Sequence, residues 1–98
     1  MVNTADTALH AEVRALLADF FSRPLEDLGD SQHLVDDLYA DSLELLDLVV
    51  VLSEHYGVEI EAAHLLQMKT VGDVVSVLAT LLAVKAEQKS PGAAMAPS

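Results

Sequence analysis

The chain has 98 residues, a formal net charge of −11 with neutral histidines, and no cysteine. This length predicts one small domain without a deep active-site cleft, and the charge disfavours binding to nucleic acids and anionic membranes. The lack of cysteine excludes disulfides and thiolate nucleophiles and fits a reducing cytoplasm. We find no signal-peptide pattern and no apolar run of the ~18 residues that span a membrane. We therefore expect a cytoplasmic monomer whose partners carry basic surfaces.

The first apolar stripe predicts a helix over residues 5–21, preceded by a flexible N-terminus over residues 1–4. Its apolar side chains recur at helical spacing, namely Leu9, Val13, Leu16, Leu17 and Phe20. Pro24 follows closely and favours an end before it. Residues 22–41 form a long connection with a short turn over residues 24–28. We expect five apolar side chains to anchor it to the core, namely Leu25, Leu28, Leu34, Val35 and Leu38.

A second helix is predicted to begin at Asp41 or Ser42 and to end at about Tyr56. Asp41 and Glu44 have the spacing of a capping box, and Gly57 allows a left-handed helix end. The apolar run Val-Val-Val at 49–51 also suits a strand, but the length of the segment and its caps favour a helix.

A brief third helix is predicted over residues 61–66, and Thr70 caps a fourth that fades near Glu87. Residues 89–98 have no periodicity and are predicted to form a disordered tail after a domain over residues 5–88. The predicted fold is therefore all-α, a bundle of three longer helices and one short helix.

The string Leu-Tyr-Ala-Asp-Ser-Leu-Glu at 38–44 opens the second helix, inside a stretch that has no Lys or Arg from Pro24 to Met68. An isolated Asp-Ser-Leu indicates no more than a helix-capping serine. Here, however, the segments 54–60 and 69–73 and the order of the helices also fit one pattern. Together they resemble the acyl carrier protein family from about Leu9 to Lys85, including its bundle fold.

The resemblance implies that Ser42 receives 4′-phosphopantetheine from coenzyme A, in a phosphoryl transfer carried out by a separate phosphopantetheinyl transferase. The arm would hold acyl groups as thioesters, and a helix start tolerates the phosphate. The chain would then be no enzyme but a discrete carrier and phosphoprotein in polyketide or fatty acid biosynthesis. An acyltransferase or acyl-ligase would load it, and a ketosynthase or other pathway enzymes would use the cargo.

Two further residue sets follow from the resemblance and from helical spacing. Docking to basic partner surfaces is assigned to Asp41, Leu43, Glu44, Asp47, Val51 and Glu54; the alternative is an ordinary solvated helix face. An acyl pocket between the second, third and fourth helices is assigned to Val49, Val50, Leu52, Ile60, Leu65, Leu66 and Val71; the alternative is an ordinary core.

The chain departs from the family pattern at three positions. Tyr39 replaces the usual glycine, and Ser53 and His55 lie where acids are common. These departures favour a specialised pathway such as polyketide assembly. A peptidyl or aminoacyl carrier and a non-covalent acidic helical adaptor remain as alternatives.

Catalysis and metal binding are disfavoured by the sequence. There is no Gly-x-Ser-x-Gly elbow for a serine hydrolase, and the acidic loop 30–36 lacks the ligand spacing of a calcium loop. The histidines lie far apart, without the spacing of metal ligands. They are His10, His33, His55 and His64.

Overall fold

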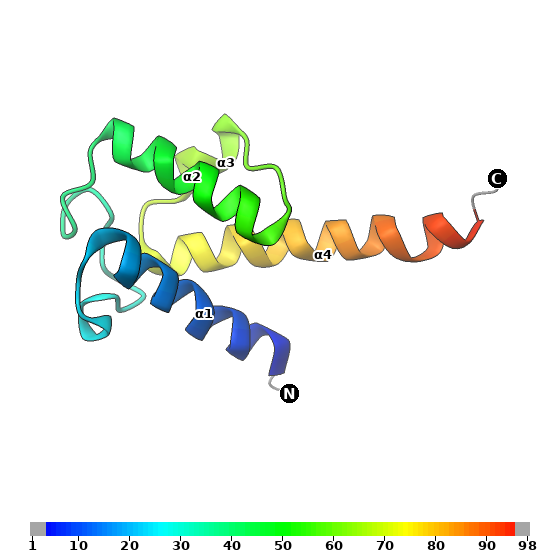
Figure 1. Ribbon diagram of the computed structural model, residues 1–98, viewed down its shortest axis with the longest axis horizontal. Coiled ribbons are helices and arrows are strands. Elements are labelled where there is room, and N and C mark those ends of the chain that lie inside the picture. Colours follow the sequence, from blue (N-terminus) through cyan, green and yellow to red (C-terminus); the bar gives the residue numbers. More distant parts are fainter. Residues whose placement is uncertain (1–3, 96–98) are drawn as a thin grey trace.

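The computed structural model describes the backbone of residues 4–95 and the side chains of residues 8–87. It contains four α-helices and one short 3-10 helix (Figure 1). Their bounds are α1 Thr4–Phe21, η1 Leu25–Asp27, α2 Ser42–Tyr56, α3 Ala62–Gln67 and α4 Val71–Met95. The described residues form no strand, and His33 and Thr70 make an isolated bridge. The prediction of an all-α bundle with three longer helices and one short one is confirmed.

The core is built from aliphatic side chains of α1, α2, α4 and the long connection between α1 and α2. Every fully buried large side chain is Leu or Val, so burial of apolar surface rather than polar pairing holds the helices together. The buried set is Val13, Leu17, Leu28, Leu34, Leu38, Ala40, Leu48, Leu52, Met68, Val71, Val74, Val77 and Leu78.

Only some of the apolar side chains that were expected to anchor the long connection are buried. Leu28, Leu34 and Leu38 are buried, but Leu25 and Val35 are about half exposed, so the prediction is wrong for these two. An irregular segment has no periodicity that tells which apolar side chains face inward, and its path is set by contacts with distant residues.

Polar contacts complete the attachment of this connection. Arg14 on α1 donates from Nε to the carbonyl oxygen of Leu28, at 2.9 Å, and from Nη2 to the carbonyl oxygen of Leu25, at 3.0 Å. On the other side, the backbone N–H of Leu34 donates to the oxygen of Lys69, at 2.9 Å, and that of Gly72 to Asp30, at 3.0 Å. The loop therefore lies against α1 and the start of α4, and its C-terminal end is held where α2 begins.

The predicted helix boundaries hold except at the C-terminal end of α4. Gly57 ends α2 with φ +64°, and Thr70 Oγ1 accepts from the backbone N–H of Asp73, at 3.1 Å, before α4. However, α4 continues to Met95 instead of ending near Glu87, and it includes most of the segment expected to be a disordered tail. The residues after Leu82 are mainly helix formers, so the helix continues beyond the end of its apolar stripe.

Figure 1 shows the last turns of α4 extending past the ends of α1 and α2. The described part of the chain holds no helix that combines the length and the apolar character needed to cross a membrane. Residues 96–98 of the expected tail, and residues 1–3 at the other end, lie outside the described residues.

Candidate functional site

Ser42 is the first residue of α2 and is exposed. The cap of this helix is formed by its neighbours. Asp41 Oδ1 accepts from the backbone N–H of Glu44, at 2.8 Å, and Glu44 Oε1 accepts from the N–H of Asp41, at 3.4 Å. No hydrogen bond joins Ser42 Oγ to a residue that the structure describes. The interpretation of Ser42 as a plain capping serine is therefore wrong, because Asp41 takes that role.

The start of α2 fits a phosphodiester on Ser42 Oγ. The first turn of a helix presents backbone N–H groups and a partial positive charge, both of which favour an anion. The hydroxyl is accessible and is not needed by the cap. The carboxylates of Asp41 and Glu44 would repel a phosphate, but each already engages a backbone N–H.

The loop before Ser42 has an unusual backbone at Tyr39. Its φ is +61°, in the left-handed region that glycine adopts freely and other residues avoid. Leu38 and Ala40 on either side are buried. Tyr39 thus takes the left-handed conformation that glycine favours, and the departure from the family pattern lies in its side chain; the residue is 74% exposed.

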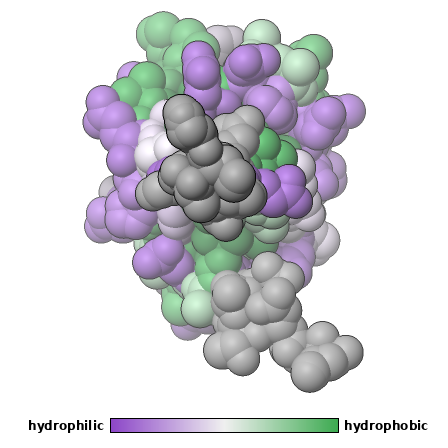
Figure 2. Space-filling view, turned by 90° about the vertical axis from the view of Figure 1, so that its right-hand side faces the viewer, coloured by the Kyte–Doolittle hydropathy of each residue, from purple (hydrophilic) through white to green (hydrophobic). Residues whose placement is uncertain are grey.

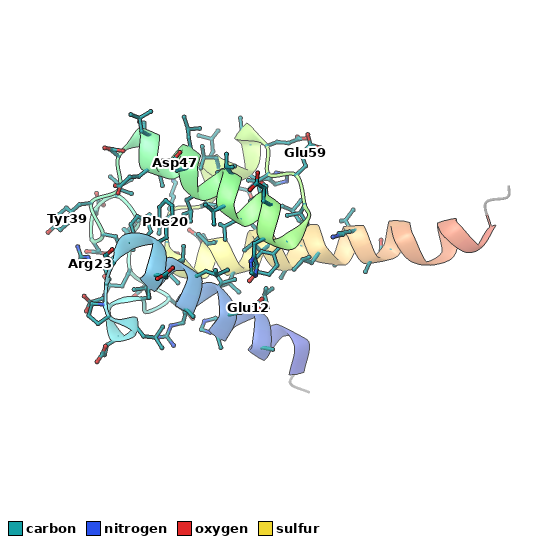
Figure 3. All side chains as sticks on the ribbon, viewed as in Figure 1. Glu12, Phe20, Arg23, Tyr39, Asp47 and Glu59 are labelled. Carbon is teal, nitrogen blue, oxygen red and sulfur yellow. The ribbon has the colours of Figure 1, made fainter. Side chains whose placement is uncertain are left out.

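Arg23, two residues after the end of α1, lies against this ring, with its guanidinium carbon 5.8 Å from the ring centroid. Figure 3 places both side chains at the same end of the molecule. Arg23 also lies 3.5 Å from a carboxylate oxygen of Asp27. Sequence reasoning missed this contact, because nothing in a sequence pattern relates two residues on opposite sides of an irregular loop.

The six residues assigned to docking are all exposed. Leu43, Asp47, Val51 and Glu54 are spaced by four, four and three residues, so the helix brings them to one face. Leu43 is 73% exposed, so it is a surface residue and not part of the core. The structure therefore brings together carboxylates and apolar side chains on the surface that begins at Ser42.

Further apolar side chains are exposed beside this face, namely Leu46, Val50 and Leu66. Figure 2 shows hydrophobic side chains at the upper edge of the molecule, where Figure 1 places α2 and α3, between hydrophilic ones. Large exposed apolar side chains that lie close together are typical of interaction surfaces.

Two of the hollows that border α3 have mainly apolar linings. One, of about 170 Å³, is lined by Leu46, Val49, Ile60, Glu61, Ala62 and Leu65. The other, of about 390 Å³, is lined by His33, Val35, Asp36, Leu45, Leu65, Leu66, Met68 and Lys69. Leu65 lines both, so the two hollows are neighbours.

The structure divides the seven residues assigned to an acyl pocket into three groups. Val49, Ile60, Leu65 and Leu66 line one or both hollows. Leu52 and Val71 are fully buried in the core. Val50 is 53% exposed and lines neither hollow, so its assignment is corrected: one residue beyond Val49, a helix has turned by about 100°. Leu45, Leu46 and Met68 are lining residues that sequence reasoning missed.

The opposite end of α2 is held by Tyr56. Its hydroxyl donates to Glu12 Oε1 on α1, at 2.8 Å, and its carbonyl oxygen accepts from Lys85 Nζ on α4, at 3.0 Å. Burial, followed by the hydrogen bond and the charge of Glu12, raises the pKa of Tyr56. Tyr56 therefore ties the three long helices together, away from Ser42. No group of three or more potential ligands among the described residues is arranged to hold a metal ion.

Comparison with known proteins agrees with this geometry. A family described as a phosphopantetheine attachment site matches residues 11–78. An acyl carrier protein of Chlamydia muridarum is 37% identical over 68 residues, which make up 69% of this chain and 88% of that protein. One of Thermotoga maritima is 34% identical over 68 residues, or 69% of this chain and 84% of that protein. The matched residues include Ser42 and the loop before it.

Proposed function

The chain belongs to the acyl carrier protein family, whose members are non-catalytic carriers with a 4′-phosphopantetheine group, and we propose that Ser42 is the residue that bears this group. The observation that carries the proposal is the free, exposed hydroxyl of Ser42 at a helix start whose cap is supplied by Asp41. In the attachment, Ser42 Oγ forms a bond to the phosphorus of coenzyme A that bears the pantetheine, the P–O bond between the two phosphates breaks, and adenosine 3′,5′-bisphosphate leaves. A separate phosphopantetheinyl transferase supplies the Mg²⁺ and the base that takes the serine proton.

Intact mass spectrometry tests the attachment site. Incubation with coenzyme A, Mg²⁺ and a broad-specificity phosphopantetheinyl transferase should add one phosphopantetheine to the chain. Ser42→Ala should abolish the addition, and Ser53→Ala, a matched change further along the same helix, should leave it intact. Full labelling of the Ser42→Ala variant would overturn the assignment.

The carrier is proposed to dock through the acidic and apolar face that extends from Asp41 to Glu54. Exposed charges on this face attract Arg and Lys of partner enzymes and raise association rates more than they tighten the complex. That property suits a carrier that must visit an acyltransferase or acyl-ligase, then a ketosynthase, and must leave each quickly. The exposed Leu43 supplies an apolar contact next to Ser42.

The acyl chain is proposed to enter the hollows between α2 and α3. The arm starts at Ser42, and Leu45, one turn along α2, lines the larger hollow, so the path from the attachment site to the hollow is short. The thiol of the arm supplies the thioester when it is loaded, and the chain's own apolar side chains shield the acyl group from water.

The cargo is proposed to belong to polyketide or fatty acid biosynthesis, in the cytoplasm. Tyr39 and His55, both exposed, support a specialised partner set. A peptidyl or aminoacyl carrier is the alternative, disfavoured by the heavy acidic charge and by Asp41 before Ser42. The intact mass of the protein purified from its host would separate these cargo classes: an attached acyl chain supports the first, and an attached amino acid supports the second.

A further inference from the structure

Tyr39 is both exposed and conformationally disfavoured. An L-residue at φ +61° crowds its own backbone, and glycine would adopt the same conformation without a steric cost. The conformation is imposed from both sides, since Leu38 and Ala40 are buried and the N–H of Ala40 donates to the oxygen of Leu34, at 2.9 Å. Packing therefore explains the path of the loop but not the tyrosine ring, and such an outlier indicates a functional role.

Arg23 is placed to hold this ring. The preceding residue, Ser22, also has a positive φ, of 55°, so the chain turns sharply at the end of α1 just before Arg23. The guanidinium lies over the ring at 5.8 Å from its centroid, within the range of a cation–π contact. No Lys or Arg follows until Lys69, and a carboxylate oxygen of Asp27 lies 3.5 Å from Arg23, so the guanidinium is held between this carboxylate and the ring.

We propose that Tyr39 is a specificity-determining contact for the phosphopantetheinyl transferase that modifies Ser42, with Arg23 as the residue that positions the ring. This inference rests on the function proposed above. The ring lies three residues before Ser42, so an enzyme that reaches Ser42 Oγ also meets the ring. Exposed aromatic rings are strong contacts at protein interfaces. The surrounding carboxylates require a basic surface on the enzyme, with an apolar group that packs on the ring.

The test measures KM and kcat for modification of the apo chain by the phosphopantetheinyl transferase of its own host, with coenzyme A and Mg²⁺. We expect the KM for the carrier to rise about fivefold to tenfold in Tyr39→Gly, because an interface anchor is lost. Arg23→Gln should raise it about twofold to threefold, since the ring stays but loses its support. Tyr39→Phe, which keeps the ring, should resemble the unchanged chain. The kcat should stay constant, because Ser42 and its cap are untouched.

Two controls separate recognition from folding. The Tm of Tyr39→Gly should stay near that of the unchanged chain, because relief of the backbone strain offsets the lost ring contact. Leu25→Ala removes another exposed apolar side chain from the same connection and should leave KM unchanged.

An unchanged KM in Tyr39→Gly would overturn the inference, and so would a fall in kcat alone, which would place the ring in the chemical step instead of in docking. In both cases Ser42 would still be labelled and the proposed function would stand. Absence of labelling in the unchanged chain would overturn the proposed function instead.

Discussion

The carboxylate of Asp41 accepts a hydrogen bond from the backbone of Glu44, and the side chain of Glu44 reaches back to the N–H of Asp41. Ser42 lies between the two capping residues and takes no part in the cap. The helix start is therefore stabilised by residues other than the one proposed to be modified. Adding a phosphodiester to Ser42 does not remove a group on which the fold depends.

Because Asp41 caps the helix and Ser42 does not, substitutions at these neighbouring residues should have different effects on stability. Asp41→Ala should cost about 1 kcal/mol, because it removes a capping side chain, which corresponds to a fall in Tm of roughly 4–8 °C for a domain of this size. Asp41→Asn keeps the cap, and Ser42→Ala leaves it alone, so both should stay close to the unchanged chain. Thermal unfolding followed by circular dichroism measures all three. A large loss of stability in Ser42→Ala would show that the hydroxyl has a structural role.

The proposed docking face predicts that the rate of loading by partner enzymes depends on salt. Charge reversal of Glu44 or Asp47 should slow loading by partner enzymes more at low than at high ionic strength, because salt screens exposed charges. Substitution of Asp47, a surface residue, should change the stability of the fold by less than about 0.5 kcal/mol. Glu44 is also a capping residue, so the helix content of the Glu44 variant has to be measured separately. Charge reversal of Glu87, on the exposed surface of α4, is the control. Equal low-salt rates for all variants would contradict the docking face.

Local signals explain why the helix starts and most helix ends could be predicted from the sequence. The capping pairs of α2 and α4 and the Gly57 stop act within a few residues, so the sequence carries them completely. At the other end of α4, the lack of periodicity over residues 89–98 predicted a tail, yet the helix runs to Met95.

The parts that could not be predicted depend on contacts between distant residues. Val49 and Val50 are chemically identical neighbours, and the position of α3 decides that Val49 lines a hollow while Val50 is exposed. The contact between Arg23 and Tyr39 depends on the path of a loop that has no regular pattern. The position of Ser42 at the start of a capped helix could be predicted from local signals. The role of Ser42 in attachment and the docking and pocket residues stay predictions.

The same pair of valines gives a matched test of the acyl pocket. Val49→Phe should fill the smaller hollow, and Val50→Phe should place its ring on the surface. An octanoyl group that enters the hollow should raise the Tm of the loaded protein, since each buried methylene contributes about 0.8 kcal/mol. We expect this rise in the unchanged chain and in Val50→Phe, but a much smaller one in Val49→Phe. Equal rises in both variants would exclude the smaller hollow as the site of the acyl chain.

Tyr56 predicts how stability depends on alkaline pH. Because its pKa is raised in the folded chain, the unfolded chain loses the tyrosine proton first, at a pH of about 10. The stabilisation is therefore complete below that pH and is lost as the pH rises above it. Tyr56→Phe lacks the hydrogen bond to Glu12, which should cost up to about 1.5 kcal/mol at pH 8, and the gap should narrow above pH 10. The free energy of unfolding is measured from denaturant curves at each pH. Tyr39→Phe is the control, and its free energy of unfolding should fall above pH 10 as in the unchanged chain.

The specialised pathway proposed for this chain predicts a mismatch with the enzymes of general fatty acid synthesis. Tyr39 and His55 lie near opposite ends of α2, so each changes a different part of the surface that a partner meets. A ketosynthase of fatty acid synthesis should therefore turn over the loaded carrier slowly. Tyr39→Gly together with His55→Glu should raise kcat/KM, and the two effects should be nearly additive because the sites lie roughly 20 Å apart. Ser53→Ala, on the same helix, should give no improvement. Efficient turnover of the unchanged chain would assign it to ordinary fatty acid synthesis.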